Sequence, residues 1–288
     1  MSLLLPEHSL SGLRILAGLD PGIAWKASLV GALGYAVLSS RKLGLDSRST
    51  YWAGLIGLAF GMWGGHLLGI YYYGMGGHSW AWFRFWTGGQ AEYGGLVAGT
   101  LAAIVLLRLR GLAVSLYADA MAPAMALGVA VGRIGCFLNG DDFGKVSHLP
   151  WAVRFLPGTE AYADHVARGW ITPNAAYSLP VHPVQIYCSL FWLGLFVVLL
   201  SVPAGLSGRR FGVLMVGHGA GRLIEQSFRG DFQTLVGAFS LTQLISFAVI
   251  AGGFVILLGS MRKAPPIPMK ANQTVPLSAE FGDEAIAS

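Results

Sequence analysis

Long apolar segments dominate the sequence, and they constrain its fold more than any other feature. A membrane-spanning helix needs about 20 mostly apolar residues, and seven segments fit this pattern. They cover residues 23–40, 52–73, 93–107, 117–137, 184–202, 211–228 and 241–260. Only 11% of the residues are charged, against about 25% in a soluble domain, and the mean hydropathy is +0.59. The sequence therefore predicts an all-α integral membrane protein with about seven transmembrane helices.

Basic residues gather in alternate loops, and this sets the predicted orientation. Ten of the 19 lysines and arginines follow spans one, three, five and seven: Arg41, Lys42, Arg48, Arg108, Arg110, Arg209, Arg210, Arg262, Lys263 and Lys270. The positive-inside rule places these loops in the cytoplasm, so the N-terminus is expected outside and the C-terminus inside. Because the net charge of +5 is scattered among spans, we expect no nucleic-acid partner. The sequence leaves the oligomeric state open.

The chain divides into three predicted parts. Residues 1–22 are expected to form an interfacial segment, and residues 23–260 a seven-helix transmembrane domain. Within that domain, residues 139–183 are long and polar enough to form a small external cap. Residues 261–288 are rich in proline and polar residues, which predicts a disordered cytoplasmic tail.

Polar residues within the apolar spans need a reason, because a charge in hydrocarbon is costly. Arg133 stands near the outer end of span four, and Asn139, Asp141 and Asp142 follow it. An ion pair with Asp141 or Asp142 is one interpretation. The other is an anion site, because a guanidinium group binds phosphate oxygens in a bidentate way. Four glycines of this motif could give a headgroup room to approach the backbone: Gly132, Gly135, Gly140 and Gly144.

Span six carries a second group of charged residues. Arg222, Gln226 and Arg229 share one helical face by their spacing. Glu225 is three residues after Arg222 and four before Arg229, so it can pair with either. Two arginines against one glutamate leave positive charge unmatched, which predicts an anionic ligand. His218 lies one turn before Arg222, and a structural role is the alternative to a catalytic one.

Span three opens with the sequence Ala91-Glu-Tyr-Gly-Gly95. Tyr93 places a hydroxyl at the outer interface, where anchoring in the aromatic belt is the alternative to chemistry. Gly94 and Gly95 would allow close approach of a substrate. The sequence contains no P-loop, no HExxH motif and no cysteine–histidine cluster with metal spacing. Nothing in it calls for a metal or an organic cofactor.

The stretch GRIGCFLNGDDFG resembles the signature of the prolipoprotein diacylglyceryl transferase family, a Gly-Arg-x-Gly-Asn-Phe-x-Asn-x-Glu-x-x-Gly run. Supporting blocks occur in the family's order: EYGGLVAG, LYADAMAPAMALGVAVGR, the signature, LPVHPVQIY and GAGRLIEQSFRGD. Together they cover roughly residues 23–260. Proteins of this family move the diacylglyceryl group of phosphatidylglycerol to the lipobox cysteine thiol of a prolipoprotein and release glycerol phosphate.

The resemblance implies an enzyme of lipoprotein biosynthesis in the bacterial cell inner membrane, with its active site toward the outer face. Phosphatidylglycerol, a prolipoprotein and membrane lipids would be its partners. It implies phosphate binding by Arg133 and Arg222, with Tyr93 or His218 as candidate bases. Further substrate-binding or supporting positions would be Asn139, Asp141, Gly144, Arg229, Glu225, Gly94 and Gly95.

Several positions depart from the family's pattern. Cys136 stands where the signature has asparagine, and Asp141 replaces its glutamate. Tyr93 occupies a position that is often histidine, whereas His218 occupies a tyrosine position. Glu225 comes one residue earlier than the family's glutamate, and Lys26 follows Trp25 where a tyrosine is expected. A related lipid-dependent transferase with another acceptor, or a non-catalytic lipid-binding or transport protein, therefore stays an alternative.

Overall fold

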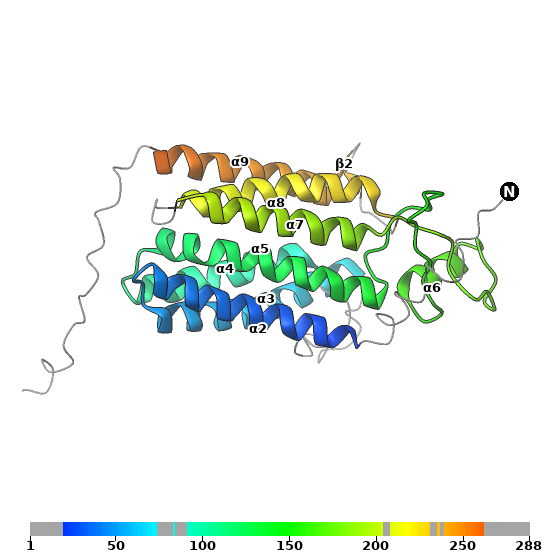
Figure 1. Cartoon of the computed structure of the whole chain (residues 1–288), viewed down its shortest axis with the longest axis horizontal. Helices are drawn as coiled ribbons and strands as arrows, with labels where there is room; N and C mark the ends of the chain where they lie inside the picture. Colours follow the sequence, from blue (N-terminus) through cyan, green and yellow to red (C-terminus); the bar gives the residue numbers. More distant parts are fainter. Residues whose placement is uncertain are drawn as a thin grey trace, which may run out of the picture.

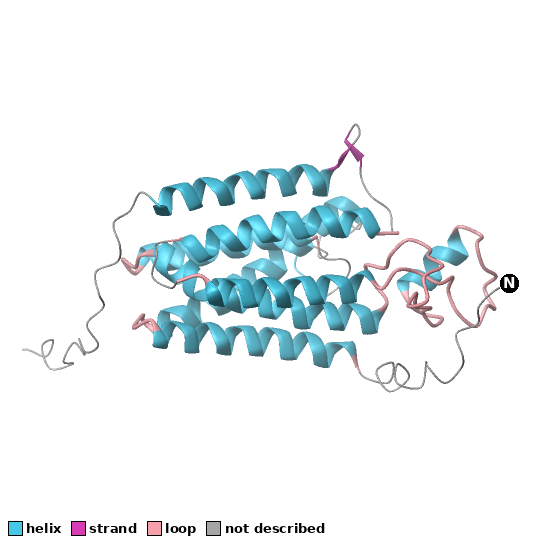
Figure 2. Ribbon diagram, turned by 45° about the horizontal axis from the view of Figure 1, so that its top comes forward, coloured by secondary structure: helices cyan, strands magenta, loops and turns pink. Residues whose placement is uncertain are grey.

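The fold is a bundle of long helices with a small cap at one end (Figure 1). The structure is a computed structural model and describes residues 20–73, 83, 91–203, 208–230, 235–236 and 239–261. Its long helices are α2 (Pro21–Lys42), α3 (Ser47–Tyr73), α4 (Glu92–Leu109), α5 (Val114–Asn139), α7 (Val184–Ser201), α8 (Arg209–Phe228) and α9 (Leu241–Met261). A short helix, α6 (Glu160–Ala167), belongs to the cap, and the strands β1 (Leu235–Val236) and β2 (Phe239–Ser240) form an antiparallel pair before α9 (Figure 2).

The predicted all-α membrane class is confirmed. Within the described ranges, α2, α3, α4, α5, α7 and α9 are long and apolar enough to cross a membrane. The predicted span 211–228 corresponds to α8, which has 20 residues but is not among these six. Charged side chains lower the apolar character of α8, and the bundle buries two of them, Arg222 and Glu225. Residues 1–19 of the predicted interfacial segment lie outside the described residues, and so do residues 262–288 of the predicted tail.

Helix α5 is the central element of the bundle, and it packs against α2, α7 and α8. Small residues make this possible, because alanine and glycine let helix backbones approach closely. Ala122, Ala126 and Ala130 are buried in one core cluster with Trp192 and Leu195 of α7. Two helix pairs flank this centre: α3 with α4, and α8 with α9. Close backbone contacts between α4 and either α8 or α9 are few or absent.

Glycines on α3 and α4 allow these two helices to pack with their backbones in contact. A Cβ atom on Gly99 would lie 2.6 Å from the carbonyl oxygen of Gly57, and one on Gly95 would lie 3.0 Å from that of Gly61. A Cβ on Gly94 would overlap the carbonyl of Gly64. Gly94 and Gly95 therefore make room for α3, which corrects the expectation that their free space faces a substrate.

A buried carboxylate caps α8. Asp119 lies in α5 and is fully buried. Its two oxygens accept hydrogen bonds from the backbone N–H groups of Gly208, at 2.9 Å, and Phe211, at 3.0 Å. The first N–H groups of a helix have no partner within that helix, so Asp119 satisfies two of them from a neighbouring helix. This contact ties the start of α8 to α5.

We expect Gly99→Val to lower the melting temperature of the purified protein. The new side chain would meet the backbone of α3, and overpacking of this kind costs about 1–3 kcal/mol. Gly31→Val is the matched control, because a Cβ at Gly31 has nothing within 4 Å. Equal melting temperatures for the two variants would contradict the close packing of α3 against α4.

Candidate functional site

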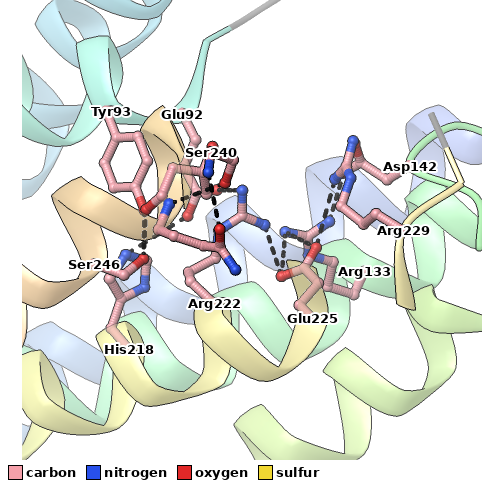
Figure 3. Close-up of polar contacts among 12 residues, drawn as sticks. Glu92, Tyr93, Arg133, Asp142, His218, Arg222, Glu225, Arg229, Ser240 and Ser246 are labelled. Carbon is pink, nitrogen blue, oxygen red and sulfur yellow. Dashed lines mark hydrogen bonds and ion pairs between the residues drawn. The ribbon is translucent and has the colours of Figure 1, made fainter. Parts of the chain in front are cut away.

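Charged side chains from four segments meet where α5 and α8 end, near the cap. Arg133 comes from α5, Asp142 from the turn after it, and Glu92 from the first residue of α4. Arg222 and Glu225 come from α8, and Arg229 is its C-cap residue. Figure 3 shows these six side chains reaching toward one another in a row. We call them the ion-pair network: Glu92, Arg133, Asp142, Arg222, Glu225 and Arg229.

Glu225 is the centre of the network. Its Oε2 lies 2.6 Å from Arg222 Nη1, and its Oε1 lies 3.1 Å from Arg133 Nη2 and 3.5 Å from Arg229 Nη1. The helix spacing predicted that Glu225 pairs with Arg222 or Arg229, and the structure confirms both pairs. Only 2% of its side chain is exposed. A buried carboxylate needs such partners, because an unpaired buried charge is strongly destabilising.

Asp142 closes one end of the network. Its Oδ2 contacts Arg133 Nη1 at 2.5 Å, and its Oδ1 contacts Arg229 Nη2 at 2.6 Å. Burial raises the pKa of the Asp142 carboxyl, but the guanidinium groups of Arg229 and Arg133 outweigh burial and hold that pKa well below its usual range. Of the two aspartates that the sequence offered to Arg133, the structure selects Asp142.

Local backbone geometry brings Asp142 to its partners. Gly140 ends α5 with φ +73°, and Asp142 itself has φ +53°, a left-handed conformation that aspartate tolerates better than most residues. The chain then pairs with the end of α8, because Lys145 N–H donates to the Phe228 carbonyl at 2.8 Å and Gly230 N–H donates to the Phe143 carbonyl at 3.0 Å. This backbone pairing places Asp142 opposite Arg229.

Glu92 closes the other end of the network. Its Oε2 lies 3.2 Å from Arg222 Nη2, and its Oε1 lies 3.8 Å from His218 Nε2. His218 packs against Trp192, with ring centroids 5.4 Å apart, and meets Tyr93 edge-on at 6.4 Å. The Tyr93 hydroxyl lies 3.0 Å from Ser246 Oγ and donates to the Thr242 carbonyl at 3.3 Å. Both partners belong to α9.

The network is balanced in charge, which corrects one sequence-based expectation. Arg133, Arg222 and Arg229 face Glu92, Asp142 and Glu225 within the described part of the chain. The expectation of unmatched positive charge on α8 is therefore wrong. It failed because Glu92 and Asp142 reach the arginines of α8 from other parts of the chain.

Asn139 and Asp141 lie beside the network. Asn139 Nδ2 donates to Asp141 Oδ2 at 2.8 Å, and Gln185 Nε2 donates to the Asp141 backbone carbonyl at 2.6 Å. Burial raises the pKa of the Asp141 carboxyl. Among the described residues, Cys136, Asp141 and Asp142 have side-chain atoms that could bind a metal ion, and these atoms lie within 4.8 Å of one another. Two arginines already occupy the oxygens of Asp142, which makes this trio a poor metal site.

The signature glycines provide space that the protein's own side chains use. A Cβ on Gly135 would lie 2.5 Å from Trp25 Nε1, and one on Gly140 would lie 2.7 Å from Thr159. At Gly144 it would lie 2.7 Å from Val184, and at Gly132 it would meet Ser28. These contacts correct the expectation that the glycines leave room for a headgroup. They let α2, the cap and the start of α7 close around the network.

Sequence reasoning missed Glu92 and Ser246 as members of this region. Glu92 was visible as a charged residue at the start of an apolar span, but no spacing rule connects α4 with α8. Ser246 had no signal, since serine is common inside membrane helices. Asp142 was considered as an ion-pair partner only, because the signature's acidic position coincides with Asp141.

A family model described as prolipoprotein diacylglyceryl transferase matches residues 22–259. Several curated proteins named phosphatidylglycerol–prolipoprotein diacylglyceryl transferase are similar to the chain. The protein of Corynebacterium diphtheriae is 31% identical over 177 residues, which cover 59% of this chain and 60% of that protein. The protein of Clostridium tetani is 33% identical over 178 residues, covering 61% of this chain and 66% of that protein. For the protein of Mycolicibacterium paratuberculosis, 29% identity extends over 75% of this chain and 53% of that protein. The matched region thus spans between about half and two thirds of these relatives' lengths.

We expect Asp142→Asn to lower stability at neutral pH by about 1.5–3 kcal/mol, as for other hydrogen bonds to charged groups. Asparagine keeps the size of the side chain and tolerates the left-handed backbone. The folded-state pKa of Asp142 is depressed, so its stabilisation is present above the ordinary pKa of 3.8 and is lost as the pH falls below that value. The difference in melting temperature between the wild type and the variant should therefore begin to shrink between pH 4 and pH 3, and it closes only as the pH falls through the lower folded-state pKa.

Asp164→Asn is the control for this measurement. Asp164 makes one ion pair, with Arg168 in the cap, and the Arg168 side chain is 36% exposed, whereas Asp142 pairs with two arginines that are 10% and 12% exposed. A pair with an exposed partner contributes little. We expect a smaller change at pH 7 for this variant. A difference between Asp142→Asn and the wild type that stays constant with pH would contradict the account of Asp142.

Proposed function

Because the chain belongs to the prolipoprotein diacylglyceryl transferase family, we propose that it transfers the diacylglyceryl group of phosphatidylglycerol to the cysteine thiol of a prolipoprotein lipobox. The observation that carries this proposal is the ion-pair network, which holds two buried arginines, Arg133 and Arg222, among the helices, with Arg229 beside them at the end of α8. The curated relatives are named for this reaction.

The reaction needs a site of this kind. The thiolate sulfur attacks the diacylglyceryl carbon that carries the phosphate ester, and a carbon–sulfur bond forms as the carbon–oxygen bond breaks. The electron pair of the broken bond leaves with the oxygen of glycerol phosphate, whose negative charge grows in the transition state. Positioned guanidinium groups stabilise that charge more than they stabilise the bound lipid, and this difference is what accelerates a reaction.

Each arginine and its partners receive a role in this proposal. Arg133 and Arg222 bind the phosphate, since they come from two different helices and converge on Glu225. Arg229 and Glu225 hold these two guanidinium groups in place. Asn139 and Asp141 shape the turn that carries Asp142. Gly94 and Gly95 pack against α3 and so help to place Glu92 and Tyr93, whereas Gly144 packs against the chain before α7, two residues after Asp142.

The proposal also includes a location. The network lies toward the C-terminal ends of α5 and α8, which face the cap end of the bundle (Figure 1). The basic loops at the opposite end favour a cytoplasmic position for that end. The N-terminus is then outside and the C-terminus inside. The site would open toward the outer face of the bacterial cytoplasmic membrane, where phosphatidylglycerol and an exported prolipoprotein can both reach it.

The thiol proton must pass to a base, and two side chains compete for this role. Tyr93 hydrogen-bonds with α9, and a phenol ordinarily ionises only near pH 10. His218 has a buried Nε2 that makes no hydrogen bond among the described residues, and an imidazole is an effective base near neutral pH. His218 therefore acts as the base, and Tyr93 positions its ring.

We expect Arg133→Ala and Arg222→Ala each to lose about 100-fold or more in activity, as for other groups that stabilise a developing oxyanion. Complementation of a bacterial strain depleted of its own transferase measures this loss. The wild-type chain should restore growth and lipoprotein maturation, and both variants should fail while remaining in the membrane. Arg209→Ala, at the far end of α8, is the control and should complement. Full complementation by either site variant would contradict the phosphate assignment.

We expect His218→Gln to reduce the rate of glycerol phosphate release by about 100-fold or more. Tyr93→Phe removes one hydroxyl but keeps the ring against His218, so its rate should fall much less. Both rates can be measured with purified protein, phosphatidylglycerol and a lipobox peptide. A larger loss for Tyr93→Phe than for His218→Gln would assign the base to Tyr93 instead.

A further inference from the structure

The charge balance of the ion-pair network raises a question about anion binding. Three arginines already face three carboxylates, and all three guanidinium groups are about nine-tenths buried. A phosphate that simply joined this set would add an unmatched negative charge to a largely buried site, which is costly. One carboxylate must therefore leave its arginine when a phosphate arrives.

The three carboxylates differ in how easily they can leave. Glu225 contacts all three arginines and is 2% exposed. Asp142 is held by one arginine on each oxygen, and the backbone pairing of its turn with the end of α8 fixes its position. Glu92 contacts a single arginine, Arg222, at 3.2 Å, and its side chain is 35% exposed. It is the carboxylate with the weakest hold; its exposure is close to the 32% of Asp142, so the single ion pair is what sets it apart.

The surroundings of Glu92 also allow it to move. It is the first residue of α4, and α4 has few or no close backbone contacts with α8. Its second oxygen lies 3.8 Å from His218 Nε2, beyond hydrogen-bond distance, so Arg222 is its one close ion-pair partner among the described residues (Figure 3). On the other side, Arg222 Nε is buried and has no hydrogen-bond partner among the described residues. Arg222 thus retains a donor for an incoming oxygen.

We propose that Glu92 is a displaceable placeholder, which occupies the phosphate position on Arg222 until the phosphate of the lipid donor replaces it. This inference rests on the proposed function and adds a residue to it. The carboxylate keeps Arg222 charge-balanced and oriented while the site is empty. When the phosphate binds, Glu92 releases Arg222, so that the three arginines again face as many anions as before.

A purely structural role for Glu92 makes the opposite prediction. If Glu92 were only a clamp that orients Arg222, its neutralisation would loosen the arginine and weaken anion binding. If Glu92 is a placeholder, its neutralisation removes a competitor and strengthens anion binding. Glu92→Gln separates the two roles, because glutamine has the same shape and no charge.

The experiment measures the affinity of the purified, full-length protein for sn-glycerol 1-phosphate by titration calorimetry. We expect Glu92→Gln to bind this probe about tenfold more tightly than the wild type. When Glu92 occupies the phosphate position most of the time, only the small remaining fraction of the protein can bind the probe, and the apparent affinity falls in proportion to that fraction. Glu92→Asp keeps the charge and should stay close to the wild type. Glu160→Gln, at an exposed position of the cap, changes the net charge equally and should bind as the wild type does.

Each outcome decides something. Affinity of Glu92→Gln that is equal to or weaker than that of the wild type overturns the placeholder role and leaves the proposed function standing. A wild-type protein that does not bind glycerol phosphate, or binds it equally well after Arg222→Ala, overturns the phosphate assignment and the inference with it. If Glu92→Gln is unstable when empty, glycerol phosphate should raise its melting temperature more than that of the wild type, and an equal or smaller rise overturns the inference.

Discussion

Buried charge in an apolar bundle is the constraint on which the rest of this structure depends. Arg133 and Arg222 are buried among the helices, where an unpaired guanidinium group would be very costly, and Arg229 joins them from the end of α8. Carboxylates from three separate segments balance them, with Glu225 in contact with all three arginines. The network therefore fixes the mutual positions of α4, α5 and α8 at the cap end of the bundle. It also defines what can bind there, because a new anion must exchange with one already present.

The packing of the helices also helps to position the charged residues of the network. Helix α5 is central because its small residues let α2, α7 and α8 approach it closely, and Asp119 fixes the start of α8 against α5. The glycines of α3 and α4 join these two helices tightly. In contrast, α4 meets α8 and α9 at the site mainly through polar side chains: Glu92 with Arg222, and Tyr93 with Ser246. Such a junction can exchange partners without repacking a helix interface.

The sequence predicted the helices well, because each long apolar run leaves the chain few alternatives in a membrane. It also predicted the pairs of Glu225 with Arg222 and Arg229, since residues three and four apart on a helix are neighbours. It did not reveal Glu92, because the contact between α4 and α8 joins residues about 130 positions apart and no periodicity records it. The glycines misled for a related reason. A glycine indicates that something approaches the backbone, but only the fold shows that the neighbour is Trp25 or Gly57 and not a lipid headgroup.

These observations support the proposed transfer, in which a charge-balanced arginine network binds the phosphate of a lipid donor and a thiol displaces glycerol phosphate from the diacylglyceryl group. The most direct test is reconstitution of the purified protein with phosphatidylglycerol and a synthetic lipobox peptide, followed by mass spectrometry of the peptide. The account predicts that the peptide gains one diacylglyceryl group through a thioether, that glycerol phosphate is released, and that a peptide with serine in place of the cysteine stays unmodified. An unmodified cysteine peptide in the presence of folded protein would contradict the account.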